Sequence, residues 1–382
     1  MTPGQRTREL YLGLMSGTSM DGVDAALVDF SETAPVLIDA DTWPLPPHLQ
    51  QSLTGLVENP AGGGVDHVGE LDIELGQLFA DVVLALLGRS GVIADEVSAI
   101  GCHGQTVRHS PAPPHPHTLQ LGDPNIIAAR TGIDTVTDFR RRDLALGGQG
   151  APLAPAFHAA VFRHPDLTRT IVNIGGIANL TVLPANGERV TGFDSGPGNG
   201  LMDTWIHRCL GHACDRGGAW AADGKVHTSL LSTLLAETYL KQQPPKSTGR
   251  DHFGPVWLEQ KLGTLRTRPP DVDIQATLCE FTARTIAEAI HTHAADTRDV
   301  LVCGGGVHNH TLMRRLDDCL QQACGRAIPV NSTDSAGIHP DHVEAMAFAW
   351  LARQRIQALP GNLPEVTGAA RPAVLGGIYS GK

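Results

Sequence analysis

Apolar residues frame a short glycine-containing turn at two places, one in each half of the chain. In residues 10–30, two apolar runs enclose the turn formed by residues 16–22. In residues 170–183, two apolar runs enclose Gly175 and Gly176. Each pattern predicts a β-hairpin with a specialised tip. Two similar hairpins, each heading about half of the chain, predict two related lobes.

The remaining pattern predicts an α/β protein. Apolar residues at helical spacing predict long helices over residues 65–87 and 274–293, and short apolar runs predict further strands. The other predicted strands are residues 36–40, 97–102, 119–121, 134–136, 190–193 and 300–303, and the other predicted helices are 125–130, 201–209, 225–239, 311–324 and 341–351. Residues 110–116 are a proline-rich loop. We expect an N-terminal lobe over residues 1–150 and a C-terminal lobe over 151–382, with the final helix a candidate for return to the first lobe.

Composition narrows the function. The 382 residues carry a net charge of −11, which argues against a nucleic-acid partner but not against a small anionic ligand. There is no run of about 18 apolar residues and no signal-like N-terminus, so we expect a cytoplasmic protein without membrane association. The seven cysteines form no Cys-x-x-Cys pair and fit free thiols. Two His-x-His pairs lack accompanying cysteine or carboxylate patterns, so we expect no protein-held metal site.

The first hairpin tip is a candidate anion site. Gly17 and Gly22 permit positive φ angles, so that backbone N–H groups and the hydroxyls of Ser16, Thr18 and Ser19 can converge on a phosphate. No Gly-Lys-Ser/Thr follows, which excludes a Walker-type loop. The alternative is a tight hairpin that merely uses turn-forming residues.

Polar residues follow two predicted strands of the N-terminal half. His103 and Gln105 come after residues 97–102, where they would either bind a ligand or hydrogen-bond the strand end. Arg140 leads three arginines after residues 134–136. These would be a solvated turn or would bind a substrate carboxylate, and the second interpretation is favoured for Arg140.

Three features of the C-terminal half also have two interpretations. Asp194 follows a strand and precedes a helix, so it is either a helix cap or, as favoured by the neighbouring glycine turn, a catalytic carboxylate. The three consecutive glycines at residues 304–306 either form a simple strand-to-helix turn or allow the backbone to approach a ligand closely. Glu344 lies in an apolar helix, where it is either exposed in the first turn or bound to a partner.

Taken together, these motifs resemble the anhydro-N-acetylmuramic acid kinases, a family in the superfamily of acetate and sugar kinases, heat-shock chaperones and actin. The matching segments are residues 15–24, 103–106, 138–140, 147–153, 173–179, 193–199, 246–250, 303–306 and 343–348. Two positions depart from the family pattern: Ser195 stands where threonine is usual, and Asp251 where glutamate is frequent. The departures affect the geometry of two turns rather than the expected reaction.

The resemblance implies two actin-like, ribonuclease H-like lobes with a central nucleotide cleft. It implies a kinase that uses ATP and Mg²⁺ to open 1,6-anhydro-N-acetylmuramic acid and phosphorylate its O6, and it implies a homodimer. Asp194 would be the catalytic base that activates water. The residues implied in ATP binding are Gly17, Thr18, Ser19, Met20, Asp21, Gly22, Val23, Asp24, Gly175, Gly176, Gly304, Gly305 and Gly306. The residues implied in sugar binding are Ser16, His103, Gln105, Arg140 and Glu344.

Two other classes of function remain open at this stage. A conventional sugar or acetate kinase would use its aspartate to deprotonate a substrate hydroxyl instead of water. A nucleotide-switched chaperone or filament protein would hydrolyse ATP slowly without a sugar. The absence of further subdomains after the second lobe counts against this last class.

Overall fold

The chain forms two compact units, described here from a computed structural model that covers residues 8–17, 20–59, 64–249 and 252–382. Unit 1 contains residues 1–157 and 342–382, and unit 2 contains residues 158–341. The chain passes from unit 1 to unit 2 at residue 157, against the expected boundary at residue 150. The chain after residue 341, which contains the helix named as a candidate for return, packs with unit 1. Helix α5 (Ala154–Phe162) carries the chain from unit 1 into unit 2.

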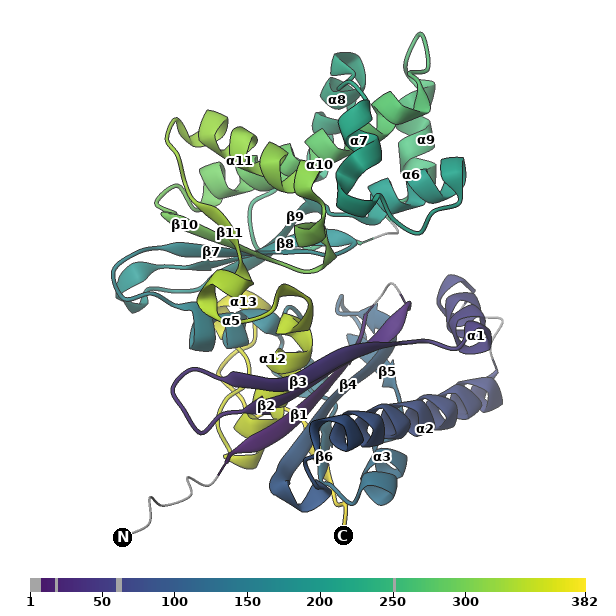
Figure 1. Ribbon diagram of the computed structural model, residues 1–382, viewed down its shortest axis with the longest axis vertical. Coiled ribbons are helices and arrows are strands. Elements are labelled where there is room, and N and C mark those ends of the chain that lie inside the picture. Colours follow the sequence, from purple (N-terminus) through teal and green to yellow (C-terminus); the bar gives the residue numbers. More distant parts are fainter. Residues whose placement is uncertain (1–7, 18–19, 60–63, 250–251) are drawn as a thin grey trace. The chain divides into compact units, whose positions relative to one another are not determined.

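Unit 1 is built on a mixed sheet in the order β12-β6-β4-β1-β2-β3, with β5 paired to β4 (Figure 1). Its strands are β1 (Leu10–Ser16), β2 (Gly22–Asp29), β3 (Val36–Pro44), β4 (Val97–Ser110), β5 (His117–Leu121), β6 (Thr135–Thr137) and β12 (Gly377–Tyr379). Its helices are α1 (Pro47–Glu58), α2 (Val65–Ser90), α3 (Pro124–Thr131), α4 (Arg141–Ala145), α12 (Val343–Ile356) and α13 (Pro364–Thr367), with a 3₁₀ turn η1 (Ala94–Glu96). Strands β1, β2 and β3 are antiparallel, whereas β1, β4 and β6 are parallel.

Unit 2 repeats this plan with the order β9-β8-β7-β10-β11. Its strands are β7 (Arg169–Ile174), β8 (Ile177–Leu183), β9 (Thr191–Pro197), β10 (Asp299–Cys303) and β11 (Val330–Ser332). Its helices are α6 (Gly200–Leu210), α7 (Ala219–Asp223), α8 (Thr228–Leu235), α9 (Pro255–Gly263), α10 (Asp271–His293) and α11 (His310–Cys324). The 3₁₀ turns are η2 (Ala185–Gly187), η3 (Arg216–Gly218), η4 (Thr238–Lys241), η5 (Gly305–His308), η6 (Thr333–Ala336) and η7 (Pro340–His342), the last of which crosses into unit 1. The shared strand order and directions identify two actin-like, ribonuclease H-like units.

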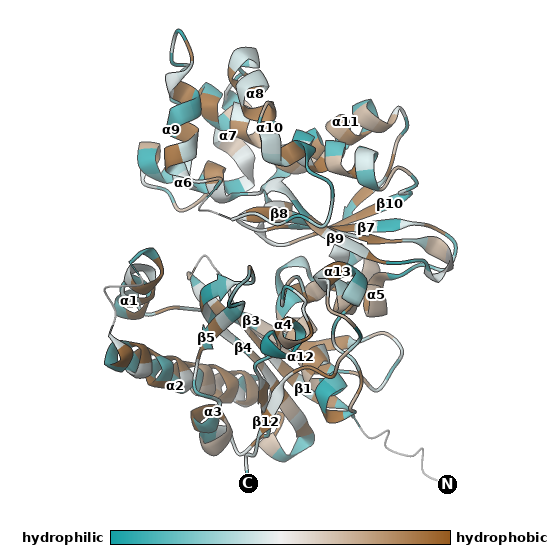
Figure 2. Ribbon diagram, turned by 180° about the vertical axis from the view of Figure 1, so that it is seen from behind, coloured by the Kyte–Doolittle hydropathy of each residue, from teal (hydrophilic) through white to brown (hydrophobic). Residues whose placement is uncertain are grey.

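In each unit, alternation along the strands divides the sheet into two buried faces. Leu12 and Leu14 of β1 join the core beneath α2, and Gly13 points to the opposite face, beneath α12. A Cβ atom at Gly13 would overlap the backbone of Ala345, so glycine lets α12 approach the sheet closely. In unit 2, α10 is buried along most of its length and contributes many apolar side chains to the core. Figure 2 shows hydrophobic residues gathered along β10 and within α2.

Both predicted hairpins are confirmed, as β1–β2 and β7–β8, and the long helices α2 and α10 are confirmed as well. Two predictions were wrong in extent. The strand predicted to end at residue 102 continues to Ser110, because β5 pairs with its second half. The helix predicted over residues 225–239 is the shorter α8, followed by the 3₁₀ turn η4. Among the described residues, no helix is both long and apolar enough to cross a membrane.

Candidate active site

The tip of the first hairpin is tied to the neighbouring strand β4. The Ser16 hydroxyl lies 2.7 Å from the Gln105 Oε1 and 3.0 Å from the carbonyl oxygen of Gly22. The Gln105 amide donates to the carbonyl oxygen of Gly17 over 3.2 Å. Ser16 and Gln105 are buried, so their polar groups fix the shape of the turn.

The other residues implied in ATP binding at this tip differ in what they can offer a ligand. Thr18 and Ser19 lie outside the described residues. The side chains of Met20 and Val23 are buried in the core of unit 1, so only their backbone groups are available to a ligand. Asp21 is exposed, and the Asp24 carboxylate accepts a hydrogen bond of 2.6 Å from the Thr42 hydroxyl.

His103 and Arg140, which are 37 residues apart in the chain, contact each other directly. The Nε of Arg140 donates to the Nε2 of His103 over 3.0 Å, so the histidine proton lies on Nδ1, which is 2.8 Å from the carbonyl oxygen of Gly104. Burial and the Arg140 charge hold the pKa of His103 well below its usual value. A second hydrogen bond, of 2.8 Å to the carbonyl oxygen of Gly150, fixes the Arg140 guanidinium.

Glu344 lies in the first turn of α12 and is partly buried. Burial and the nearby Asp24 raise the pKa of Glu344, and Arg140 lowers it. Burial lowers the pKa of Arg140 to about 10, and Glu344 and Asp143 oppose that effect. The resulting arrangement is a guanidinium with acidic neighbours and an adjacent neutral imidazole, which suits a polar, partly anionic ligand.

Asp143 was missed by the sequence reasoning, although it supports this arrangement. Its carboxylate is fully buried and accepts hydrogen bonds from the backbone N–H of Gly150 (2.8 Å), the Asn362 amide (2.7 Å) and the Thr367 hydroxyl (2.7 Å). Asp143 thereby holds the loop whose carbonyl oxygen binds Arg140. Two of these three donors, Asn362 and Thr367, lie more than 200 residues further along the chain. No local sequence pattern could have indicated them.

Asp194 lies within β9 of unit 2 and is held by the chain that follows α8. Its Oδ2 accepts a 2.9 Å hydrogen bond from the backbone N–H of Thr248, its own N–H donates to the carbonyl oxygen of Lys246, and its carbonyl oxygen accepts from the Tyr239 hydroxyl. Burial raises the pKa of Asp194 to about 6, and Thr248 and Lys246 oppose that rise. Because Asp194 is not followed at once by a helix, it does not act as a helix cap. Its fixed, partly buried carboxylate suits a general base.

Three glycine turns of unit 2 pack against one another near this strand. The N–H groups of Gly198 and Asn199, which end β9 and precede α6, donate to the carbonyl oxygens of Gly176 and Gly175. Cβ atoms at Gly304 and Gly306 would overlap Asn173 and Ile174 of β7. By contrast, a Cβ at Gly175 or Gly305 would meet no atom closer than 3.7 Å. Packing therefore explains Gly304 and Gly306, whereas at Gly175 and Gly305 a side chain would meet only ordinary van der Waals contacts.

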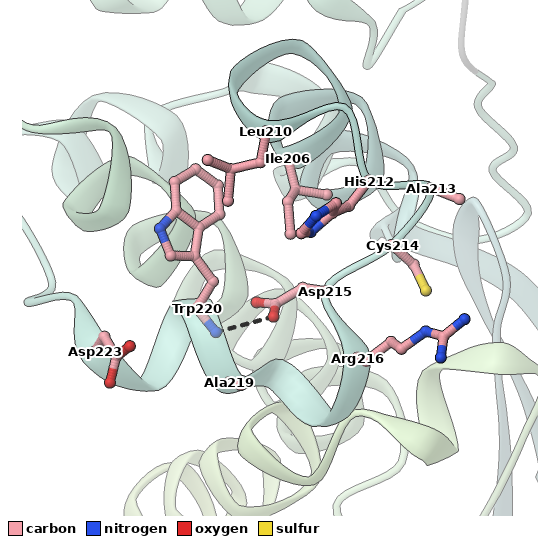
Figure 3. A pocket seen from close by; sticks show the side chains of 10 residues that line it. All are labelled: Ile206, Leu210, His212, Ala213, Cys214, Asp215, Arg216, Ala219, Trp220 and Asp223. Atoms are coloured by element: carbon pink, nitrogen blue, oxygen red, sulfur yellow. Dashed lines mark hydrogen bonds between the residues drawn. The ribbon is translucent and has the colours of Figure 1, made fainter.

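A cavity of about 550 Å³ lies on the helical side of unit 2 (Figure 3). It is lined by Ile206, Leu210, His212, Ala213, Cys214, Asp215, Arg216, Ala219, Trp220 and Asp223. Asp215 caps α7 by accepting hydrogen bonds from the N–H groups of Trp220 and Ala221. The loop that lines the cavity packs closely on the residue after η5, because a Cβ at Gly218 would overlap Asn309. The sequence reasoning missed this cavity, whose lining comes from a region without a recognisable motif.

Within the described residues, no group of three or more His, Cys, Asp or Glu side chains is arranged to hold a metal ion. The pair His308 and His310 is not such a group, since the His308 Nε2 instead lies 2.8 Å from the Asp341 carboxylate. Arg250 and Asp251, which belong to the motif after Lys246, lie outside the described residues.

The family model for anhydro-N-acetylmuramic acid kinase matches residues 9–381. This chain belongs to that family. It is 49% identical over 376 residues to the anhydro-N-acetylmuramic acid kinase of Coxiella burnetii (strain Dugway 5J108-111), covering 98% of each chain. It is 50% identical over 373 residues to the enzyme of that name from Vibrio parahaemolyticus, covering 97% of this chain and 98% of the relative.

A solved structure of the activator of the 2-hydroxyisocaproyl-CoA dehydratase from Clostridium difficile with bound ADPNP aligns with 91% of this chain and 96% of its own. The TM-score is 0.46 and the sequence identity 14%. The fold assignment rests on the strand order of the two units and on family membership rather than on this similarity.

Proposed function

We propose that this protein is a cytoplasmic kinase of peptidoglycan recycling, which opens 1,6-anhydro-N-acetylmuramic acid and phosphorylates O6 at the expense of ATP. The products are N-acetylmuramic acid 6-phosphate and ADP. Family membership over residues 9–381 supports the reaction class. The observation that carries the proposal is Asp194, a carboxylate fixed by the Thr248 N–H and raised in pKa to about 6, which suits a base working near neutral pH.

The proposed reaction couples two displacements. Asp194 accepts a proton from a water molecule as the water oxygen forms a bond to C1 of the sugar. The C1–O6 bond breaks, and O6 forms a bond to the γ-phosphorus of ATP as the bond from that phosphorus to the ADP oxygen breaks. An alkoxide is a poor leaving group, and capture by phosphorus replaces the general acid that would otherwise protonate it.

In unit 1, we propose that Arg140 binds the carboxylate of the substrate. The guanidinium is fixed by His103 and Gly150, which leaves its shape preorganised for a planar anion. Glu344, whose pKa is raised, would bind a hydroxyl or amide of the sugar. Ser16 and Gln105 are proposed to act by shaping the adjacent turn, since their hydrogen bonds are made within the protein.

We propose that the glycine turns bind the phosphates of ATP. At Gly175 and Gly305 a Cβ would meet no atom closer than 3.7 Å, which leaves room beside their backbone, and Gly17 is the corresponding candidate in unit 1. Mg²⁺ would accompany ATP and neutralise phosphate charge. It would be held mainly by phosphate oxygens and water.

We propose that the cavity beside Trp220 receives the adenine base. Its walls include the apolar side chains of Ile206 and Leu210, which suit a flat aromatic ring. Gly218, in the loop that lines it, packs on Asn309, the residue that follows η5. The volume of about 550 Å³ is sufficient for a base and part of its ribose.

The decisive experiment is a coupled ADP-release assay on the purified protein. The anhydro sugar should support ADP release, whereas N-acetylmuramic acid and an ordinary hexose should not support a comparable rate. Phosphorylation of the hexose or of the opened sugar at an equal rate would favour a conventional sugar kinase. Slow ATP hydrolysis without any sugar would favour a nucleotide-switched protein.

We also propose that the protein is a homodimer, as the family resemblance implies. Light scattering coupled to size-exclusion chromatography should give twice the mass of the 40.4 kDa chain. A mass equal to one chain at assay concentration would contradict this proposal.

A further inference from the structure

Residues 239–248, here called the strap, hold Asp194 at three points. The Tyr239 hydroxyl donates to the Asp194 carbonyl oxygen over 2.9 Å, and the Lys246 carbonyl oxygen accepts from the Asp194 N–H over 3.1 Å. The Thr248 N–H donates to the carboxylate over 2.9 Å. The strap therefore fixes both the backbone and the side chain of this aspartate.

The strap also carries a buried cation. Lys246 is 9% exposed, and its Nζ donates to the carbonyl oxygen of Leu240 over 3.1 Å and lies 3.5 Å from that of Tyr239. The ammonium lies 5.0 Å from the centre of the Tyr239 ring and 5.9 Å from that of Phe193, the residue before Asp194. Carbonyl groups and rings provide no full negative charge, so a buried ammonium needs a carboxylate nearby.

The carboxylate electrostatically coupled to this ammonium is that of Asp194, whose backbone N–H donates to the Lys246 carbonyl oxygen. Among the described residues, the titratable groups around this pair include Tyr239 from η4 and His293 from α10. His252 also contacts the strap, with its Nδ1 3.3 Å from the Thr248 hydroxyl and its ring against that of Tyr239. Burial and Asp194 raise the pKa of Tyr239, and burial and Lys246 lower the pKa of His293. Neither Tyr239 nor His293 supplies a second positive charge beside Asp194 near neutral pH. Tyrosine carries no positive charge, and the lowered pKa of His293 favours its neutral form. Lys246 is thus the positive charge that opposes the effect of burial on Asp194.

We propose that Lys246 is a positioning residue that keeps the Asp194 carboxylate ionised and in place near neutral pH. This inference rests on the proposed function, in which Asp194 accepts a proton from water. Burial makes Asp194 a stronger base, and unopposed it would favour the protonated carboxyl further. The Lys246 ammonium and the Thr248 N–H limit that rise, so that a basic yet ionised carboxylate results.

A purely structural role for Lys246 must be separated from this one, because the side chain also caps two carbonyl groups of the strap. Lys246→Met removes the charge and keeps the length of the side chain. We expect the acid limb of the kcat/KM profile to move up by about one pH unit, which is the effect of losing a nearby opposite charge. The loss should therefore be about tenfold below the new midpoint and should fade at higher pH.

Two variants serve as controls. Lys246→Arg keeps the positive charge and should keep the midpoint close to that of the wild type. Lys241→Met removes an exposed lysine from the same strap and should leave the whole profile unchanged. A loss in Lys246→Met that is equal at every pH would show a structural role only and would overturn the inference.

The coupling can also be measured without turnover. In protein labelled with ¹³C at aspartate side-chain carboxyls, the Asp194 signal is identified by its absence from Asp194→Asn, and its pKa should rise in Lys246→Met. In the reverse direction, Asp194→Asn should lower the pKa of the Lys246 ammonium, because the coupling between two sites is reciprocal.

These outcomes distinguish the two levels of the proposal. If Lys246→Met moves the carboxyl pKa but not the rate profile, the role of Asp194 as base fails and the effect of Lys246 stands. If the pKa of neither partner responds to loss of the other, the inference about Lys246 fails whatever the activity. Should Lys246→Met not fold, the near-isosteric Asp194→Asn variant still tests the coupling through Lys246.

Discussion

The Nε of Arg140 donates a hydrogen bond to the Nε2 of His103 over 3.0 Å. This contact links the two residues that were expected, for separate reasons, to bind the sugar. Since burial and the adjacent guanidinium keep His103 neutral, the imidazole serves as an acceptor that orients Arg140. The pair therefore presents one positive charge in a fixed geometry.

Arg140→Lys should weaken substrate binding, because lysine cannot reproduce the planar fork or reach His103 and Gly150 together. We expect KM for the anhydro sugar to rise by about 10- to 100-fold, as for loss of a charge-assisted hydrogen bond of about 1.5–3 kcal/mol. KM for ATP should not change. Arg141→Lys, at an exposed arginine paired with Asp138, is the matched control and should be close to wild type. An unchanged sugar KM in Arg140→Lys would remove this residue from the binding site.

Asp143→Asn should destabilise unit 1. In the wild type, Gly150, Asn362 and Thr367 all donate hydrogen bonds to the fully buried carboxylate. The asparagine replaces one of the two acceptor oxygens with an NH₂ group, so at least one of these donors would face another donor. We expect a loss of about 2–4 kcal/mol in the free energy of unfolding, measured by urea denaturation. Asp138→Asn, at a more exposed position nearby, should change it by less than about 0.5 kcal/mol. Equal stability of the two variants would mean that the buried acceptors are dispensable.

The sequence predicted the fold well because its signals there are local. The hairpins β1–β2 and β7–β8 each contain both of their strands and their turn within about 20 residues, so apolar patterning was sufficient. The full length of β4 was missed because its second half is stabilised by pairing with β5 rather than by its own apolar residues. The close approach of α12 left one local trace, glycine at positions 13 and 101 within strands.

The site was predicted less completely than the fold, for the same physical reason. Asp194 and Arg140 were identified because each follows a predicted strand next to a turn motif. The groups that tune them, Lys246 and Asp143, act through hydrogen bonds and charge across many residues of sequence. Such partners can be found only when the chain is folded.

Asp194→Asn should abolish turnover and yet raise stability at neutral pH. The amide keeps an oxygen for the Thr248 N–H but cannot accept a proton, so kcat should fall by about 10²- to 10⁴-fold with ATP and sugar still bound. Because the carboxyl pKa is raised from 3.8 to about 6 in the folded protein, the ionised form opposes folding above pH 6.

The stability gain of Asp194→Asn should therefore depend on pH. We expect a gain on the order of 1 kcal/mol at pH 8, declining as pH falls through about 6, where wild-type Asp194 becomes protonated in the folded state. Thermal denaturation of both proteins across this range measures it. A constant difference in Tm at all pH values would show that the Asp194 carboxyl is not raised in pKa.

Trp220→Ala should impair nucleotide binding selectively. If the cavity receives adenine, loss of its aromatic wall should raise KM for ATP by about tenfold, as for loss of a base–aromatic contact of about 1–3 kcal/mol, and should leave KM for the sugar unchanged. Nucleotide addition should also change the fluorescence of the wild type, and Trp220→Phe should lose that change. Unaltered ATP kinetics in Trp220→Ala would place the base elsewhere.

Reaction in ¹⁸O-labelled water tests the coupled mechanism directly. Water that attacks C1 becomes the anomeric oxygen of the product, whereas O6 of the sugar becomes the oxygen that bridges to phosphorus. The label should therefore appear at C1 and not in the bridging position, provided that the product is examined before the anomeric oxygen exchanges with solvent.

The same experiment separates Asp194 as a base for water from a base for a sugar hydroxyl. A conventional kinase would need the anhydro bridge opened first and would then phosphorylate a free 6-hydroxyl. In that case N-acetylmuramic acid would be an equally good substrate. Its phosphorylation in labelled water would introduce no label into the product, because no water takes part in the phosphoryl transfer. Attack at C1 must oppose the departing O6, so the coupled route also fixes the configuration of the first-formed product as inverted at C1. Label in the phosphate ester bridge, retention at C1 or equal rates on the opened sugar would each overturn the coupled mechanism, and the actin-like fold and the family membership would stand.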